Sequence, residues 1–341
     1  MWKQLLAASL ALISTQGAAR TYTNPVLDTD FPDPTVIRAP DGSYYGYATQ
    51  TKRSGAWINI QLGQSKDLTH WRIVGDALPV KPTWASDTQD FWAPHVIRHG
   101  KTYIMYYSAK PNGSDERHGL CLGIAKASSP TGPFRDIGHP LQCGSGFVNI
   151  DPMEFDDPAT GKHLLYWGSG FEPLKVQELA PDLISFAPGS APKDLVWPSP
   201  NRSGFPVLVE GSWVIRRGGY YYLFYSGDNC CGPKANYAVM VARSKSATGP
   251  FETLEQVTGK PHSIILEKRG HWIAPGHNSI VTDRNGRDWI VYHAVDTRRP
   301  REDPADELNT RRIMLIDPIV WRNGWPVIEG PSSGRRNAPR P

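Results

Sequence analysis

The feature of this sequence that most constrains its fold is a unit that recurs five times. The copies open at residues 33, 93, 151, 210 and 277, and the first, third and fourth open on an acidic residue. Each opening is followed by a turn containing glycine and then by a segment rich in aromatic residues, such as 44–48 and 220–225. Self-similarity at this period is typical of a radial array. We therefore predict an all-β fold, a five-bladed β-propeller of four-stranded blades.

Local composition supports an all-β chain. Thirty-one prolines and thirty-two glycines interrupt almost every helical window, and the apolar runs are short. Two similar phrases, SPTGPF at 129–134 and SATGPF at 246–251, support the repeat independently. In the fourth copy we predict strands at 206–216, 220–226, 237–244 and 251–257. The loops after each second strand should form the walls of a cleft: 51–56, 110–119, 170–174, 228–234 and 297–309.

The two ends of the chain differ from the repeats. Residues 1–19 combine Lys3, a short apolar run and a small-residue site at 17–19, which predicts a secretory signal peptide and a secreted, extracellular protein. Residues 20–329 form the single propeller domain. Residues 330–341 are rich in glycine, serine, proline and arginine, so we predict a disordered tail.

Bulk properties exclude two classes of partner. No further segment is long and apolar enough for a membrane helix. The formal charge of +4 is modest, and no basic stripe with interleaved aromatics indicates nucleic-acid binding. We expect a monomer. The four cysteines fit an oxidising compartment: Cys121 pairs with Cys143 and Cys230 with Cys231, or one of the two other connectivities holds.

Three carboxylates stand out. Equivalent positions in a ring of blades surround one axis, so we expect Asp33, Asp151 and Glu210 to converge there. Both aspartates precede proline, where aspartate also caps turns, whereas Glu210 interrupts an apolar strand in which an unpaired glutamate is rare. Inverting hydrolysis of a glycosidic bond needs a base and an acid roughly 6.5–9.5 Å apart. A third carboxylate nearby raises the pKa of the acid.

Motifs in all five copies resemble glycoside hydrolase family 43, whose members are five-bladed propeller hydrolases of arabinose- and xylose-containing polysaccharides. The resemblance covers residues 24–326. The matching motifs are Asp33-Pro34, Phe91-Trp92-Ala93-Pro94, Ile150-Asp151-Pro152, Glu210-Gly211 and Gly276-His277-Asn278-Ser279.

The resemblance implies roles for individual residues. Asp33 would be the general base, Glu210 the general acid, and Asp151 the residue that orients the acid and raises its pKa, with inversion at the anomeric carbon. Substrate-binding residues would be Phe91 and Trp92 at the floor of the sugar site, His277 on the axis, and Arg312. No cofactor is required, and His277 would lie beside either a structural calcium ion or a water molecule in the central channel. The loop at 228–232 is not part of the family pattern. Its cysteine pair either contacts substrate or only cross-links a surface loop.

These observations predict a hydrolase of pentose linkages in plant cell-wall arabinan or arabinoxylan. The leading activities are α-L-arabinofuranosidase and β-xylosidase, with endo-1,5-α-L-arabinanase as the alternative. A non-catalytic carbohydrate-binding propeller is the rival from another class. It has no need of an acid, a base and a modulator together, so the complete carboxylate set favours the enzyme. An interaction scaffold with no affinity for sugar is disfavoured by the acidic axis.

Overall fold

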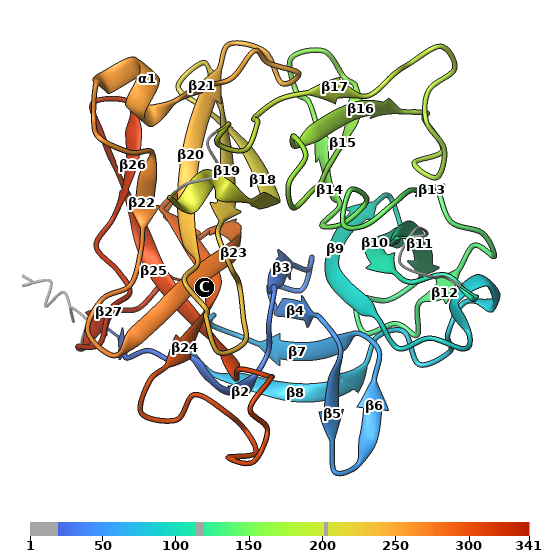
Figure 1. Cartoon of the computed structure of the whole chain (residues 1–341), viewed down its shortest axis with the longest axis horizontal. Coiled ribbons are helices and arrows are strands. Elements are labelled where there is room, and N and C mark those ends of the chain that lie inside the picture. The colour runs from blue at the N-terminus through green and yellow to red at the C-terminus, as the bar shows by residue number, and fades with distance from the viewer. Residues whose placement is uncertain (1–19, 114–118, 201–203, 341) are drawn as a thin grey trace, which may run out of the picture.

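Five small sheets form a ring in the computed structural model (Figure 1). The structure describes residues 20–113, 119–200 and 204–340. The predicted signal peptide, 1–19, lies outside the described residues. None of the helices in these ranges is long and apolar enough to cross a membrane. The predicted five-bladed β-propeller is confirmed.

The first three blades are antiparallel sheets in which strand order follows chain order. Blade one contains β3 (Thr35–Arg38), β4 (Tyr44–Ala48), β7 (Gln61–Ser65) and β8 (Trp71–Asp76), with the hairpin β5 (Thr51–Arg53) and β6 (Ala56–Ile58) after β4. Blade two follows the 3-10 turn η1 (Thr83–Ala85) and contains β9 (Phe91–His99), β10 (Thr102–Ala109), β11 (Cys121–Ala127) and β12 (Arg135–Asp136), with β13 (Gln142–Cys143) also on β11. Blade three contains β14 (Met153–Asp156), β15 (His163–Trp167), β16 (Lys175–Leu179) and β17 (Lys193–Asp194).

The last two blades carry additional short strands. Blade four follows the 3-10 turn η2 (Phe205–Val207) and contains β18 (Val209–Arg217), β19 (Tyr220–Gly227), β20 (Ala238–Ser244) and β21 (Glu252–Thr253), with β22 (Ile264–Leu266) also on β20. Blade five contains β23 (Trp272–Thr282), β24 (Asp288–Asp296), β25 (Arg312–Arg322) and, from the other end of the chain, β2 (Leu27–Asp30), with β26 (Trp325–Ile328) also on β25. Since β2 precedes blade one, its pairing with β25 closes the ring.

The fourth strand of blade four is shorter than predicted. Strand β21 ends at Thr253, and helix α1 (Leu254–Thr258) replaces the rest of the predicted 251–257 strand. Thr253 and Gln256 form a capping box, and Gly259 ends the helix in the left-handed conformation. These local caps satisfy the free backbone groups of a one-turn helix, so they override the β-rich context.

Residues 330–340 of the C-terminal tail are ordered, which corrects the disorder predicted for the tail at 330–341. Strand β27 (Arg336–Asn337) pairs with β1 (Thr21–Tyr22), and the buried Ser332 donates its backbone N–H to Asp317 at 3.1 Å. The Arg340 backbone N–H reaches Asp283 at 3.3 Å. Composition suggested disorder because the tail has no core of its own, but its partners lie far away in the sequence.

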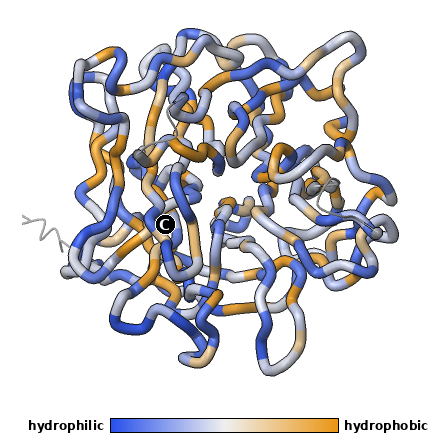
Figure 2. Tube along the Cα trace, in the orientation of Figure 1, coloured by the Kyte–Doolittle hydropathy of each residue, from blue (hydrophilic) through white to orange (hydrophobic). Residues whose placement is uncertain are grey.

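Hydrophobic packing lies between neighbouring blades, and the rim loops are largely hydrophilic (Figure 2). The repeated phrase noted in the sequence has a role in this packing. The Tyr47 hydroxyl of blade one donates to the Pro130 carbonyl at 2.5 Å, and the Tyr166 hydroxyl of blade three donates to the Ala247 carbonyl at 2.6 Å. Pro130 and Ala247 occupy the same place in the two phrases. The conserved turn shape therefore gives a buried tyrosine of the preceding blade its hydrogen-bond partner.

Two disulfides are present. Cys121–Cys143 joins β11 to β13, and Cys230–Cys231 links adjacent residues. This is the first of the three connectivities that the sequence left open.

Candidate active site

The five blades open on a common backbone feature. One residue at each opening has a positive φ angle: Asp33 (56°), Ala93 (46°), Asp151 (56°), Gly211 (63°) and His277 (45°). In all five the backbone N–H donates to a side chain of the preceding blade: Asp33 to His293 Nδ1 (3.1 Å), Ala93 to Thr49 Oγ1 (2.8 Å), Asp151 to Ser108 Oγ (3.0 Å), Gly211 to Asp151 Oδ2 (3.0 Å) and His277 to Ser226 Oγ (2.9 Å). Positive φ is uncommon outside glycine, and its concentration in one ring is typical of a functional site.

The structure corrects the predicted alignment of blade four by one residue. There the positive φ belongs to Gly211, and Glu210 lies one position earlier. The bulges agree, because register breaks after Trp92 in β9, Glu210 in β18 and Gly276 in β23. Glu210 is thus equivalent to Trp92, whereas Asp33 and Asp151 are equivalent to each other. Glu210 approaches the axis from a different backbone position than the two aspartates.

Asp33 is a buried carboxylate with a dense set of donors. Thr49 Oγ1 donates to its Oδ2 at 2.6 Å, and Arg312 Nη1 donates to its Oδ1 at 3.0 Å. Burial alone would raise its pKa, but the Arg312 cation and the neighbouring imidazoles hold the pKa of Asp33 well below the usual range. Asp33 is therefore ionised throughout the neutral range.

Asp151 lies across the axis from Asp33 and close to blade four. Its Oδ2 accepts the Gly211 N–H at 3.0 Å and lies 3.8 Å from His277 Nδ1. A β-carbon at Gly211 would lie 3.3 Å from His277 Nδ1, and glycine accommodates both this close approach and the positive φ without strain. Burial, together with the negative charges of Glu210 and Asp33, raises the pKa of Asp151 well above its usual range.

Glu210 is held by a single aromatic side chain. The Tyr237 hydroxyl donates to Glu210 Oε1 at 2.6 Å. The tyrosine ring lies directly over Gly276, where a β-carbon would come within 2.0 Å of it. Burial raises the pKa of Glu210 to about 7, although the Tyr237 hydrogen bond lowers it, and the Asp33 charge adds to the increase. A carboxyl group with a pKa near 7 can donate a proton at neutral pH, whereas the ionised Asp33 cannot.

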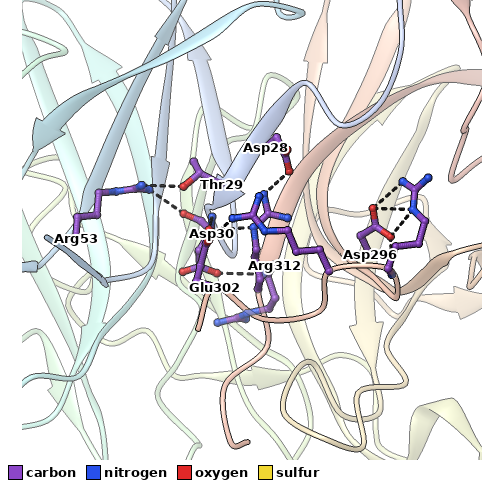
Figure 3. A network of polar contacts seen from close by, with 10 residues as sticks. Asp28, Thr29, Asp30, Arg53, Asp296, Glu302 and Arg312 are labelled. Atoms are coloured by element: carbon purple, nitrogen blue, oxygen red, sulfur yellow. Dashed lines mark hydrogen bonds and ion pairs between the residues drawn. The ribbon is translucent and has the colours of Figure 1, made fainter. Parts of the chain in front are cut away.

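Arg312 reaches the site from β25 and is fixed by a polar network (Figure 3). Its backbone N–H donates to Asp30 Oδ1 at 3.0 Å, and the Asp30 N–H donates to Glu302 at 3.1 Å. The neighbouring Arg311 is turned away and pairs with Asp28 and Glu302. Arg53, in the β5–β6 hairpin, donates to the Asp30 carbonyl in β2 at 2.9 Å and so holds the hairpin against that strand. The network holds the guanidinium that keeps Asp33 ionised.

Two histidines complete the inner ring. His277 Nδ1 lies 3.5 Å and His293 Nδ1 3.3 Å from Asp33 Oδ1. Burial lowers the pKa of His277 and lowers that of His293 to about 4, so both rings are neutral at pH 7. The positive charge that faces the Asp33 carboxylate at pH 7 therefore comes from Arg312.

The residues around His277 do not fit a calcium ion held by side chains. Calcium takes six to eight oxygen ligands. The carboxylates nearest His277 are Asp33, already paired with Arg312, and Asp151, which accepts the Gly211 N–H. Among the described residues, the group of His, Cys, Asp and Glu side chains close enough to share a metal does not include His277.

The two predicted aromatic residues of blade two lie in different environments. Trp92 is half-buried and stacks on Phe147, with ring centroids 6.1 Å apart and an interplanar angle of 16°. Phe147 is 51% exposed. Phe91, predicted to bind substrate, is instead fully buried against Tyr107, because adjacent residues of a strand face opposite sides. Of the two predicted aromatic residues, Trp92 is the one that forms part of an exposed aromatic stack, with Phe147.

The loop with adjacent cysteines precedes Tyr237, the hydrogen-bond partner of Glu210. It leads directly into Tyr237, and the Gly232 N–H donates to Thr310 Oγ1 at 3.1 Å. The loop thereby packs against the 297–311 segment that carries Glu302. That it contacts substrate stays a prediction.

Sequence reasoning missed Tyr237, His293, Thr49 and Phe147. The first three lie in or next to the second or third strands, where aromatic, histidine and threonine residues are expected for packing alone. Their contacts between blades distinguish them from residues that only pack. The Tyr237 and His293 rings are stacked, with centroids 5.7 Å apart and an interplanar angle of 6°, so the partner of Glu210 packs on the partner of Asp33.

Removing the Tyr237 hydroxyl should move the basic limb of the pH profile. Tyr237→Phe deletes a donor that stabilises ionised Glu210, so we expect the pKa of Glu210 to rise by on the order of one pKa unit. An acid catalyst stays protonated to higher pH when its pKa rises, and the fall in kcat above neutrality should shift upward. Rate measurements between pH 5 and 9 check this, and an unmoved limb would contradict the role of Tyr237.

Removing the Arg312 cation should move the opposite limb. In Arg312→Gln, burial acts on Asp33 without a compensating charge, so we expect the pKa of Asp33 to rise. A base is lost as pH falls through its pKa, and kcat/KM should therefore decline at higher pH than in wild type. Arg298→Gln is the matched control, because Arg298 pairs with Asp296 in a nearby loop (Figure 3). Equal profiles for Arg312→Gln and the control would refute this account.

Comparison with known proteins agrees with the fold. The sequence profile of glycosyl hydrolases family 43 matches residues 22–326. The chain is 29% identical over 327 residues to a probable arabinan endo-1,5-alpha-L-arabinosidase A of Aspergillus clavatus, covering 92% of this chain and 96% of that protein. It is 28% identical over 350 residues to the extracellular exo-alpha-(1->5)-L-arabinofuranosidase ArbA of Cellvibrio japonicus, covering 95% and 90%.

Solved structures give the same result. A thermostable family-43 glycoside hydrolase aligns with a TM-score of 0.75 at 28% identity, covering 94% of this chain and 99% of that one. The alpha-L-arabinanase of Cellvibrio cellulosa aligns with a TM-score of 0.71 at 25% identity, covering 88% and 95%. A five-bladed propeller with this sequence profile is a glycosidase, which hydrolyses O-glycosyl bonds. The chain belongs to glycosyl hydrolases family 43, whose enzymes generally work without a cofactor.

Proposed function

We propose that this protein is a secreted, inverting hydrolase of α-L-arabinofuranosyl linkages in arabinan. The observation that carries the chemistry is the opposite protonation of two carboxylates in one ring. Asp33 has its pKa held well below the usual range, whereas burial raises that of Glu210 to about 7. Two carboxyl groups whose environments separate their pKa values are suited to act as base and acid.

In the proposed mechanism the ionised Asp33 removes a proton from a water molecule. That water attacks the anomeric carbon while Glu210 gives its proton to the departing glycosidic oxygen. Arg312 holds Asp33 in place and Tyr237 holds Glu210, so both groups meet the substrate without reorganising. Since water adds directly from one face as the leaving group departs from the other, the configuration inverts.

Asp151 acts through its neighbours in this proposal. Its carboxyl group lies between the Gly211 N–H and His277, directly beside the strand that carries Glu210. Like charges at close range resist joint ionisation, so a negative charge on Asp151 would favour the protonated form of Glu210, just as Glu210 raises the pKa of Asp151. Trp92 and Phe147 offer stacked aromatic faces for a sugar ring.

Arabinan is the proposed substrate because the relatives named above carry arabinan-cleaving names. The related alpha-L-arabinanase of Cellvibrio cellulosa has also been solved in complex with arabinohexaose, and that complex is 26% identical to this chain. The extracellular relative supports secretion. β-Xylosidase activity, predicted beside arabinofuranosidase, has no comparable support among the relatives described here.

Sugar release from debranched arabinan, an aryl α-L-arabinofuranoside and an aryl β-D-xyloside tests the proposal. We expect turnover of arabinan, with β-arabinose or a β-configured reducing end appearing first in NMR spectra. Arabinose alone would indicate attack from chain ends, and a ladder of oligosaccharides would indicate internal cleavage. Retention of the α configuration would refute the mechanism. Binding of arabinan without hydrolysis would favour the carbohydrate-binding alternative.

A further inference from the structure

A second group of titratable side chains lies at the far end of the strand that follows Asp151. Glu154 and Asp156 are on β14, and His163 begins β15, directly opposite Asp156 in the strand pair. His163 Nδ1 is 3.6 Å from Glu154 Oε1 and is hydrogen-bonded to Asp156 Oδ1. One nitrogen and two carboxylate oxygens from these three residues all lie within 4.8 Å of one another.

Glu154 is an unusual member of this group, because it is buried without a partner for one oxygen. Its side chain is only 3% exposed, and Oε1 has no hydrogen-bond partner among the described residues. No arginine or lysine in the described part of the chain forms an ion pair with it. A buried carboxyl group whose oxygen lacks a hydrogen bond carries a desolvation cost, and a cation beside Oε1 would offset that cost.

We propose that Glu154, Asp156 and His163 bind one divalent transition-metal ion, with Zn²⁺ as the best match. Zn²⁺ accepts imidazole nitrogen and carboxylate oxygen at about 2.0–2.2 Å, which places tetrahedral ligand atoms roughly 3.4 Å apart. The 3.6 Å between His163 Nδ1 and Glu154 Oε1 is close to that spacing. Calcium and magnesium prefer oxygen ligands throughout.

The surroundings leave room for a fourth ligand. Asp156 is 66% exposed, so one side of the cluster opens to solvent and a water molecule can complete the coordination. The ring of His99, at the end of β9 in blade two, lies 5.8 Å from the His163 ring, outside the cluster itself. A metal here would bridge β14 and β15 at the end of blade three opposite Asp151. Its role is structural and does not depend on the proposed hydrolysis.

Calorimetric titration of chelator-treated protein with ZnCl₂ tests the site. We expect one ion per chain at micromolar affinity or better, together with a higher Tm in the presence of Zn²⁺. His163→Ala and the near-isosteric Glu154→Gln should each weaken binding at least tenfold. Circular dichroism establishes whether each variant is folded. If His163→Ala does not fold, the affinity of Glu154→Gln decides the test.

A matched control separates this site from casual binding by surface histidines. His70 pairs with Asp67 at 2.9 Å, in a similar histidine–carboxylate contact without a third, buried group. His70→Ala should titrate like wild type, and hydrolysis should be unchanged in all three variants. Absence of stoichiometric binding in wild type would overturn the proposal. So would equal affinity in wild type, Glu154→Gln and His163→Ala.

Discussion

Replacing Asp33 with asparagine is expected to lower kcat by about 10²–10⁴-fold on every glycoside, whatever its leaving group, because general-base catalysis contributes about that much. The amide keeps the shape of the carboxylate, and its single oxygen can accept from either Thr49 or Arg312, which donate to different oxygens of Asp33. It cannot take a proton from water. Steady-state rates on aryl glycosides and on arabinan measure the loss.

Asp33→Ala provides the control for a purely structural effect. It removes the carboxylate and leaves space in which a small anion such as azide or formate can replace the attacking water or its base. Partial recovery of activity with such an anion, together with unchanged binding of an arabino-oligosaccharide, is the expected result. Substantial turnover by Asp33→Asn without any added anion would rule out Asp33 as the base.

The ring of blades could be predicted because its signals are local and repeated. The strand–turn–strand pattern around 220–225 can be recognised within a short window, and the same pattern recurs at a fixed period. Asp33 and Asp151 were found for the same reason, since a position shared by repeats of a closed ring must lie near the axis. Repetition thus specifies place as well as fold.

The remaining features depend on contacts that no window contains. Ring closure requires β2 to pair with β25, which lies almost at the other end of the chain. The tail is ordered by pairing with residues at the N-terminal end. The one-residue difference at Glu210 arises because Gly211, not Glu210, takes the positive φ angle. Motif matching aligned the acidic residues with one another, and only the backbone reveals that they occupy different positions.

The partners that tune the carboxylates are the least visible in sequence. Tyr237 resembles any strand tyrosine until its hydroxyl is seen at Glu210 and its ring over Gly276. His293 is a strand histidine that accepts the Asp33 N–H from the next blade around the ring. Their roles come from the interface between blades, so the pKa values of the site are properties of the assembled ring.

Glu210→Gln is expected to produce a loss that depends on the leaving group. Natural arabinan has an alkoxide leaving group that needs a proton, so kcat should fall by about 10²–10⁴-fold, the usual contribution of general acid catalysis. An activated aryl glycoside such as the 2,4-dinitrophenyl compound releases its aryl group readily as an anion. Its kcat should therefore fall far less. Rates across a series of aryl arabinofuranosides should therefore depend more steeply on leaving-group pKa in the variant.

The pH profile of the same variant gives a second measure. In wild type, kcat should fall as pH rises through the Glu210 pKa of about 7, because the acid loses its proton. An amide does not titrate, so that limb should disappear in Glu210→Gln while the Asp33 limb at low pH remains. Glu252→Gln, which changes an exposed glutamate of the same blade, should behave like wild type. Equal losses on arabinan and on the activated glycoside would assign the acid to another residue, and the raised pKa of Asp151 would make it the next candidate.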